Sequence, residues 1–131
     1  MLFFNLNHYL FIYLGSILNH FRDDIGTKKN TKKLYDNLMQ IIMKLANEFG
    51  VVHGDFNEFN ILIKNIETHD PVMIDFPQMI SVNHELAQEY FDRDVHCIVD
   101  FFAKRFNYES DFIPCFETLD IESWNAIYKI Q

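Results

Sequence analysis

The chain has 131 residues, of which 49% are apolar and 14 are phenylalanine, so it can bury a hydrophobic core and is not a disordered chain. Its formal net charge of −8 opposes phosphate backbones, and no direct RNA binding is expected from this acidic segment. Cys97 and Cys115 are too few for a disulfide framework, which favours a reducing, intracellular setting.

The first 30 residues form an apolar segment followed by a polar loop. Residues 1–18 are rich in aromatic side chains, but Asn5, Asn7 and His8 interrupt them, so no membrane span is expected. The segment also lacks the basic start of a signal peptide. The polar loop begins at Asn19 and continues to residue 30.

A helix is predicted from Thr31, because apolar side chains then recur at intervals of three and four. They are Leu34, Leu38, Ile41, Ile42, Leu45 and Phe49. Gly50 stands where a left-handed residue would end the helix. Val51 and Val52 then form a short strand that leads into a polar loop.

That loop reads HGDFNEFN, from His53 to Asn60, and is the strongest chemical signal in the chain. Asp55 and Asn60 have the spacing of the kinase catalytic loop, in which the aspartate is the base and the asparagine a metal ligand. Such residues are common in turns, but their combination with a following Asp75-Phe76 pair indicates a phosphoryl-transfer site.

Residues 61–63 and 72–74 are apolar strand formers around a polar turn at 65–71, which predicts a hairpin. The hairpin would return Asp75 to the side of Asn60, where oxygens of both side chains could hold Mg²⁺. Pro77 takes the place of the glycine in a D-F-G motif, which predicts a stiff metal loop.

Two further helices are expected downstream, one from Asn83 or His84 and one capped by residues 92–94. The apolar stripe of the second helix comprises Val95, Ile98, Val99, Phe102 and Phe106. Arg93 is interpreted as a member of a structural ion pair, with closure of the active site as the alternative. Met39, Met43, Met73 and Met79 are predicted core residues. Residues 108–131 should form one or two short helices, with Trp124 as a packing anchor.

Three segments together, HGDFNEFN, MIDFPQMIS and YFDRDVHCIVDFFAKRF, resemble the second subfamily of RIO-type atypical serine/threonine protein kinases. The resemblance is close from about Leu34 to Phe106 and fainter back to Gly15. It implies an α+β fold, the C-terminal lobe of a protein kinase, mainly helical with a small hairpin carrying the catalytic and metal loops. Residues 1–30 would lie at the inter-lobe junction and residues 31–131 would form the lobe. No Gly-rich phosphate loop or strand lysine of an N-terminal lobe is recognisable in the chain.

The resemblance implies ATP-dependent phosphoryl transfer, as a serine/threonine kinase or an ATPase acting in small ribosomal subunit maturation. Asp55 would be catalytic, Asn60 and Asp75 would hold Mg²⁺ and the nucleotide, and Asp75 could carry a transient aspartyl phosphate. His53 and Gly54 would support the loop, and Gly54 replaces the arginine that reads a phosphorylated activation loop, so no such switch is expected. ATP and the pre-small-ribosomal-subunit particle are the implied partners, in the cytoplasm with passage through the nucleus.

Two alternatives remain open. A non-catalytic docking module for pre-ribosomal particles would explain the missing phosphate loop and lysine, and the isolated chain is expected to be weakly active or inactive. A small-molecule phosphotransferase shares the His-Gly-Asp core, but residues 75–78 and 90–106 oppose it.

Overall fold

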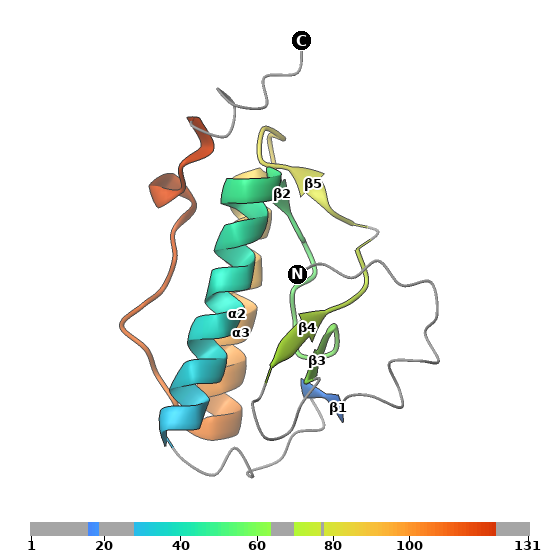
Figure 1. The fold of residues 1–131 in the computed structure, drawn as a ribbon. Coiled ribbons are helices and arrows are strands. Elements are labelled where there is room, and N and C mark those ends of the chain that lie inside the picture. Colours follow the sequence, from blue (N-terminus) through green and yellow to red (C-terminus); the bar gives the residue numbers. More distant parts are fainter. Residues whose placement is uncertain (1–15, 19–27, 64–69, 77, 123–131) are drawn as a thin grey trace.

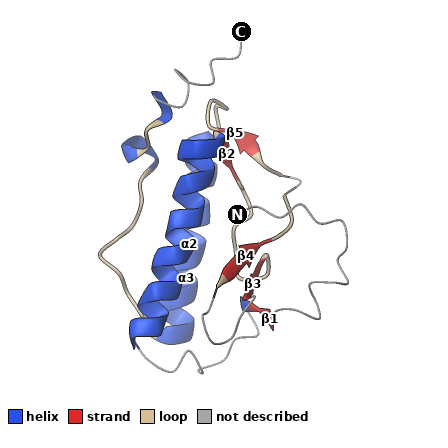
Figure 2. Ribbon diagram, in the orientation of Figure 1, coloured by secondary structure: helices blue, strands red, loops and turns tan. Residues whose placement is uncertain are grey.

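The computed structural model describes residues 16–18, 28–63, 70–76 and 78–122. Two long helices, α2 (Lys28–Phe49) and α3 (Ala87–Phe106), pack against each other. Two small antiparallel sheets lie on one side of this pair, and the segment that follows α3 runs along the other side (Figure 1). Figure 2 shows the same arrangement by secondary structure, with little strand and much helix. The structure therefore has the α+β composition that was predicted.

The first sheet has three strands in the order β1-β3-β4, and contains β1 (Ser16–Ile17), β3 (Ile61–Ile63) and β4 (Pro71–Met73). Ile61 pairs with Met73 and Ile63 with Pro71, so the predicted hairpin is confirmed, although Ile74 lies just outside β4. Its turn, residues 64–69, lies outside the described residues. The second sheet pairs β2 (Val51–Val52) with β5 (Ile80–Ser81). Two-residue strands carry no alternation pattern. β2 was predicted because both of its residues are valine, whereas β1 and β5 each contain a serine and were missed.

The N-terminal segment contributes directly to this fold. Ser16 and Ile17 pair with β3, and the side chain of Leu18 is fully buried. Helix α2 begins at Lys28, before the predicted boundary between residues 30 and 31. Residues 1–15 and 19–27 lie outside the described part, and the inter-lobe position of residues 1–30 stays a prediction.

The predicted apolar face of α2 is confirmed for most of its length. Leu34, Leu38, Ile42 and Leu45 are buried, whereas Phe49 is 48% exposed and was wrongly included. The last turn of α2 extends past the buried cluster, whose final member from this helix is Ala46. Gly50 has φ +65° and ends the helix in the predicted left-handed conformation.

Helix α3 corrects the prediction of two helices after residue 83. Residues 82–86 form turns, and a single helix runs from Ala87 to Phe106. Asp92 and Asp94 lie inside it and do not cap it, because residues 87–106 contain no glycine or proline that would interrupt the helix. The predicted stripe is present: Val95, Ile98 and Phe102 are buried, and Val99 and Phe106 pack at its edge.

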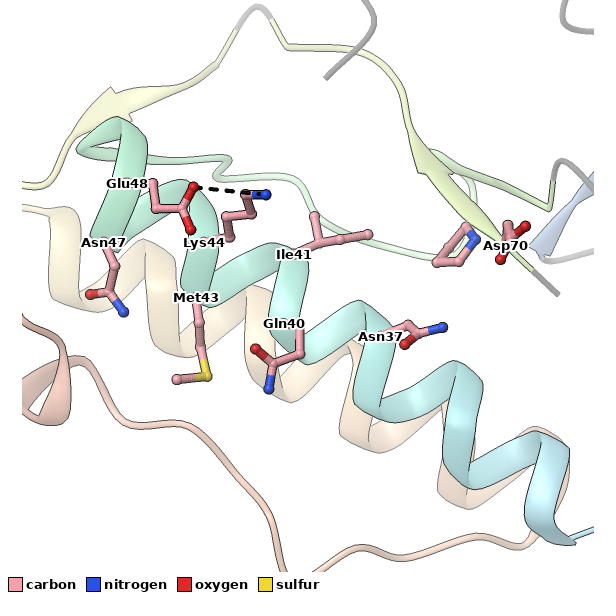
Figure 3. Close-up of a pocket in the computed structure, with 9 residues that line it drawn as sticks. Asn37, Gln40, Ile41, Met43, Lys44, Asn47, Glu48 and Asp70 are labelled. Atoms are coloured by element: carbon pink, nitrogen blue, oxygen red, sulfur yellow. Dashed lines mark ion pairs between the residues drawn. The ribbon is translucent and has the colours of Figure 1, made fainter. Parts of the chain in front are cut away.

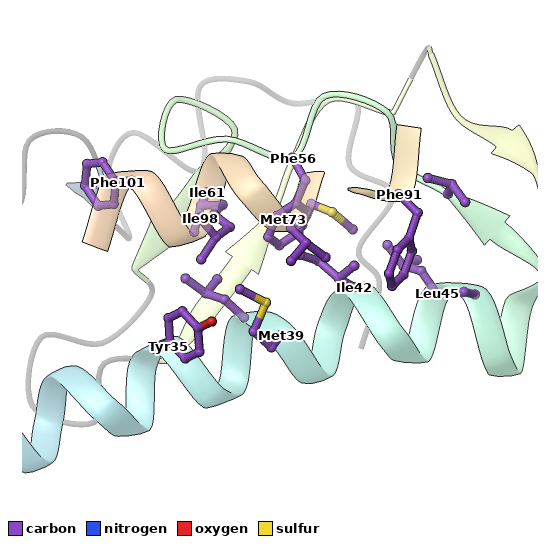
Figure 4. Close-up of a cluster of buried hydrophobic side chains, with 14 of the residues drawn as sticks. Tyr35, Met39, Ile42, Leu45, Phe56, Ile61, Met73, Phe91, Ile98 and Phe101 are labelled. Atoms are coloured by element: carbon purple, nitrogen blue, oxygen red, sulfur yellow. The ribbon is translucent and has the colours of Figure 1, made fainter. Parts of the chain in front are cut away.

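Side chains from both helices and both sheets share one hydrophobic core. In Figure 4, Tyr35 and Met39 of α2 face Ile98 of α3, with Ile61 and Met73 of the sheet beside them. Met39 and Met73 are buried as predicted, whereas Met43 and Met79 are only partly buried. Trp124 lies outside the described residues.

Tyr35 ties the segment after α3 to the core. Its ring is 1% exposed and its hydroxyl donates a hydrogen bond to the carbonyl oxygen of Phe112 at 2.7 Å. Burial raises the pKa of the Tyr35 hydroxyl, consistent with a neutral donor. We expect Tyr35→Phe to lower the free energy of unfolding by about 1 kcal/mol, because the hydrogen bond from the buried Tyr35 side chain to the Phe112 carbonyl oxygen is lost. Urea denaturation measures this, and Tyr108→Phe, on a neighbouring and less buried ring, should change stability less.

Candidate active site

The HGDFNEFN loop connects β2 to β3, and His53 holds its start in place. The imidazole is buried, its Nδ1 accepts a hydrogen bond from the backbone N–H of Asp55 at 3.1 Å, and its Nε2 lies 3.3 Å from the carbonyl oxygen of Ile74. Because Nδ1 accepts, Nε2 carries the proton and donates to Ile74. The predicted backbone contacts of His53 are therefore present, and they join the loop to the residue before Asp75.

Gly54 occupies a position with little room for a side chain. It has φ +85°, and a Cβ atom there would lie 3.1 Å from the carbonyl oxygen of Gln78 and 3.1 Å from the ring of Tyr90. The substitution Gly54→Ala is therefore expected to lower the free energy of unfolding by about 1–3 kcal/mol through backbone strain and crowding. Thermal denaturation measures it. Gly50→Ala, also at positive φ, is the matched control and should cost less if crowding at Gly54 contributes.

Two neighbouring residues of α3 form hydrogen bonds with the backbone of the loop. Asp94 accepts hydrogen bonds from the backbone N–H groups of Gly54, at 2.8 Å, and Phe56, at 3.0 Å. Arg93 donates to the carbonyl oxygen of Gly54, and its guanidinium carbon lies 4.4 Å from the centre of the Tyr90 ring. Among the described residues Arg93 forms no salt bridge within 4 Å, so the predicted ion pair is wrong. Its partners are a backbone carbonyl and a ring, because the loop crosses this turn of the helix.

Asp94 supports the loop through these hydrogen bonds, and the sequence analysis did not predict this role. Its side chain is 1% exposed, and this burial raises the pKa of its carboxyl group, while the two backbone donors, His53 and Arg93 act in the opposite direction. A signal was available in the sequence. Asp94 falls on the buried stripe of α3 between Phe91 and Val95, where an acidic residue requires hydrogen-bond donors from another element.

Asp55 and Asn60, predicted from their spacing, are in direct contact. The Asn60 Nδ2 donates to the Asp55 carboxylate Oδ2 at 3.0 Å and to the Asp55 carbonyl oxygen at 2.9 Å. The other carboxylate oxygen, Oδ1, accepts from Asn57 Nδ2 at 2.8 Å. The Asp55 side chain is exposed, so a molecule in solution can reach it.

The backbone of Asn60 also meets the segment that carries Asp75. The N–H of Ile74 donates to the carbonyl oxygen of Asn60 at 2.9 Å, as an extension of the β3–β4 pairing. Asp75 follows with φ +64°, a left-handed conformation that aspartate adopts more readily than most residues, and its side chain is exposed. The structure thus places the backbones of residues 60 and 74 side by side. Pro77 lies outside the described residues, and the predicted stiffness of the metal loop stays a prediction.

The residues present fit a Mg²⁺ ion bound together with a nucleotide. Because Asn60 Nδ2 faces the Asp55 carboxylate, Asn60 Oδ1 is the atom left for a cation. Asp75, which supplies a carboxylate, directly follows Ile74, whose N–H bonds to the Asn60 carbonyl oxygen. Magnesium is usually held by one or two protein oxygens together with phosphates and water. Within the described ranges no group of three or more His, Cys, Asp or Glu residues could form an all-protein metal cage.

A shallow hollow of about 420 Å³ lies away from this loop, between the exposed face of α2 and the start of β4 (Figure 3). Lys44 and Glu48 form an ion pair of 3.7 Å on its wall. Asp55, Asn60 and Asp75 do not line it. Its lining is largely polar side chains of one helix face, and we assign no chemistry to it.

The fold and the loop together define the class: the C-terminal lobe of a protein kinase-like fold, in which Asp55 and Asn60 are in contact and the backbone of Asn60 bonds to the residue before Asp75. The RIO domain family matches residues 15–113, and the chain belongs to this family of atypical kinases. The match begins at Gly15, the residue to which the fainter part of the resemblance was expected to extend.

The chain is similar to Rio2 kinases and, at lower identity, to Rio1 kinases. It is 52% identical over 87 residues to the serine/threonine-protein kinase RIO2 of Caenorhabditis elegans, which covers 66% of this chain and 16% of the relative. It is 49% identical over 105 residues to RIO2 of Saccharomyces cerevisiae, covering 77% of this chain and 24% of the relative. A solved structure, the Rio2 kinase-ADP/Mg²⁺-phosphoaspartate complex of Chaetomium thermophilum, matches with a TM-score of 0.67 at 32% identity, over 89% of this chain and 39% of that one. The chain thus spans less than half of each of these proteins.

Proposed function

We propose that this lobe takes part in transfer of the γ-phosphoryl group of ATP, as a serine/threonine kinase or as an ATPase. The observation that carries the proposal is the contact between Asp55 and Asn60 beside the strand end that delivers Asp75. Catalysis of this reaction consists mostly of positioning and charge stabilisation, so a small set of fixed oxygens is sufficient. The relatives support ATP as the substrate, since they are named serine/threonine-protein kinases.

Each residue has a stated role in this proposal. Asp55 orients the attacking hydroxyl group or water and accepts its proton. Asn60 Oδ1 and the Asp75 carboxylate would hold Mg²⁺, which neutralises phosphate charge when it is bound. His53 and Gly54 support the loop through their backbone contacts. The net charge of −8 makes such neutralisation necessary for a polyanionic substrate.

Asp75 has a second proposed role as a nucleophile. A carboxylate oxygen would form a bond to the γ-phosphorus while the bond from that phosphorus to the ADP oxygen breaks, and ADP would leave. Water would then attack the phosphorus, release inorganic phosphate and restore the carboxylate. The Chaetomium thermophilum structure supports this proposal, since that protein holds ADP, Mg²⁺ and a phosphoaspartate. The protein would then cycle as an ATPase switch.

The proposed setting is maturation of the small ribosomal subunit, in the cytoplasm with passage through the nucleus. In this setting the partner is a pre-ribosomal particle, contacted without direct RNA binding by this acidic segment. In the described part of the chain, neither long helix is apolar over enough residues to span a bilayer. The docking-only alternative is favoured by adjacent exposed apolar side chains at Phe112 and Ile113, which are 41% and 44% exposed.

The test uses a chimera, because the chain spans only a quarter of the yeast relative. The matched region of Saccharomyces cerevisiae RIO2 is replaced by the corresponding residues of this chain, and release of phosphate from ATP is measured with and without Mg²⁺. We expect Mg²⁺-dependent turnover in the chimera and weak or no turnover in the isolated chain. Calorimetry with ATP and Mg²⁺ accompanies the assay. A folded chimera that neither binds ATP nor turns it over would support the docking module instead.

A further inference from the structure

Asn57 lies between the two predicted site residues, Asp55 and Asn60, and forms a hydrogen bond with each of them. Its Nδ2 donates to the Asp55 carboxylate Oδ1 at 2.8 Å, and its Oδ1 accepts from the backbone N–H of Phe59 at 3.0 Å. Its backbone carbonyl accepts from the N–H of Asn60 at 3.0 Å. One residue therefore both forms the turn that returns Asn60 to Asp55 and binds the Asp55 side chain.

The orientation of the Asn57 amide follows from these contacts. A backbone N–H can only donate, so the atom facing Phe59 must be the oxygen, and the NH₂ group must face Asp55. The preceding residue anchors the loop, because Phe56 is fully buried and packs against the His53 ring with 5.8 Å between ring centroids. The amide therefore approaches Asp55 from a fixed backbone.

The Asp55 carboxylate is held at both oxygens. Asn57 donates to Oδ1 and Asn60 donates to Oδ2, so rotation of the carboxylate would break at least one of these hydrogen bonds. Asp55 is exposed, and a hydrogen bond between exposed groups adds little to folding stability. These hydrogen bonds instead fix the orientation of the Asp55 carboxylate, which matters because a general base must meet the attacking oxygen in a narrow geometry.

We propose that Asn57 is a positioning residue, which fixes the Asp55 carboxylate for the attacking hydroxyl group or water. The proposal rests on the proposed function for its kinetic consequence, but the orientation of Asp55 is a property of the chain itself. Asn57 touches no reacting atom and acts through Asp55.

Two substitutions separate positioning from turn formation. Asn57→Asp is close to isosteric, keeps an oxygen acceptor for Phe59 and loses the donor to Asp55 at neutral pH. Asn57→Ala loses both contacts. If Asn57 acts by donation, both variants should be impaired. If it acts only through the turn, Asn57→Asp should behave as the unsubstituted protein. Asn37→Asp, which makes the same change on α2 in the hollow of Figure 3, is the matched control.

The first measurement is made on the full 131-residue chain at pH 7 by NMR, with three-bond couplings that report the χ1 angle of Asp55. We expect one rotamer in the unsubstituted chain and in Asn37→Asp, and averaging over rotamers in Asn57→Asp, with a melting temperature within a few degrees. An Asp55 side chain that stays in one rotamer in Asn57→Asp would overturn the proposal.

The second measurement uses the chimera with yeast RIO2. Asn57→Asp and Asn57→Ala should each lower kcat about tenfold to a hundredfold while KM for ATP changes by less than about twofold. Unchanged kcat in Asn57→Asp, or a rise in KM alone, would contradict the proposal. A chimera without turnover would count against the proposed function, whereas the rotamer measurement would still decide the role of Asn57.

Discussion

Replacing Asp75 by asparagine in the chimera is expected to lower ATP turnover by about 10²–10³-fold, equivalent to roughly 3–4 kcal/mol of transition-state stabilisation. Asparagine keeps the shape of the side chain and tolerates the left-handed backbone at φ +64°, so the fold should be retained. The negative charge and the nucleophilic oxygen are lost together. Phosphate release at saturating ATP and Mg²⁺ measures the effect.

A second substitution at the same site distinguishes the two aspartates. Asp55→Ala should reduce turnover to a similar extent while the affinity for ATP is nearly kept, because Asp55 is assigned to the acceptor side of the reaction. Asp75→Asn should also weaken Mg²⁺-dependent nucleotide binding, measured by calorimetry. Asp100→Asn removes the same charge from the exposed surface of α3 and should leave turnover unchanged. Full turnover in both Asp55→Ala and Asp75→Asn would refute the proposed function.

Asp94→Ala is expected to lower the free energy of unfolding by about 2–5 kcal/mol. The buried backbone N–H groups of Gly54 and Phe56 would lose their acceptors, and each unpaired group costs about 1–3 kcal/mol. This is a large share of the stability of a small domain, which is typically about 5–15 kcal/mol. Urea denaturation followed by circular dichroism measures the loss. Asp92→Asn, two residues earlier on the same helix, is the control, and an equal loss in both variants would contradict the role of Asp94.

The pH dependence of stability gives a second test at Asp94. Burial raises the pKa of its carboxyl group in the folded chain, so between the unfolded and folded values the folded state binds more protons. The contribution of this group to stability is therefore present at pH values below its unfolded pKa and is lost as the pH rises through the folded value. Asp94→Asn removes this titration. The unfolding free energy of the unsubstituted chain relative to Asp94→Asn should fall as the pH rises through that window, and a relative rise would contradict it.

The sequence by itself determined those features that depend on neighbours along the chain. The intervals of three and four in α2 and α3 predicted their buried faces, because the helix repeat brings such residues to one side. The contact between Asp55 and Asn60 was also predictable, because a loop this short, with a turn at residues 57–60, leaves its ends close together. The hairpin that returns residue 74 to Asn60 followed from two apolar strands around a polar turn.

The tertiary structure alone decided the partners that lie far apart in sequence. Asp94 reaches Gly54 across 40 residues. Val51 in β2 pairs with Ser81 in β5, and no local pattern encodes either contact. The single helix α3 is another such case: its buried Asp94 resembles a helix cap in the sequence but is paired with the backbone of another segment. Periodicity and short loops constrain only the local chain, whereas a buried charge obtains its donors from whichever segment packing brings to it.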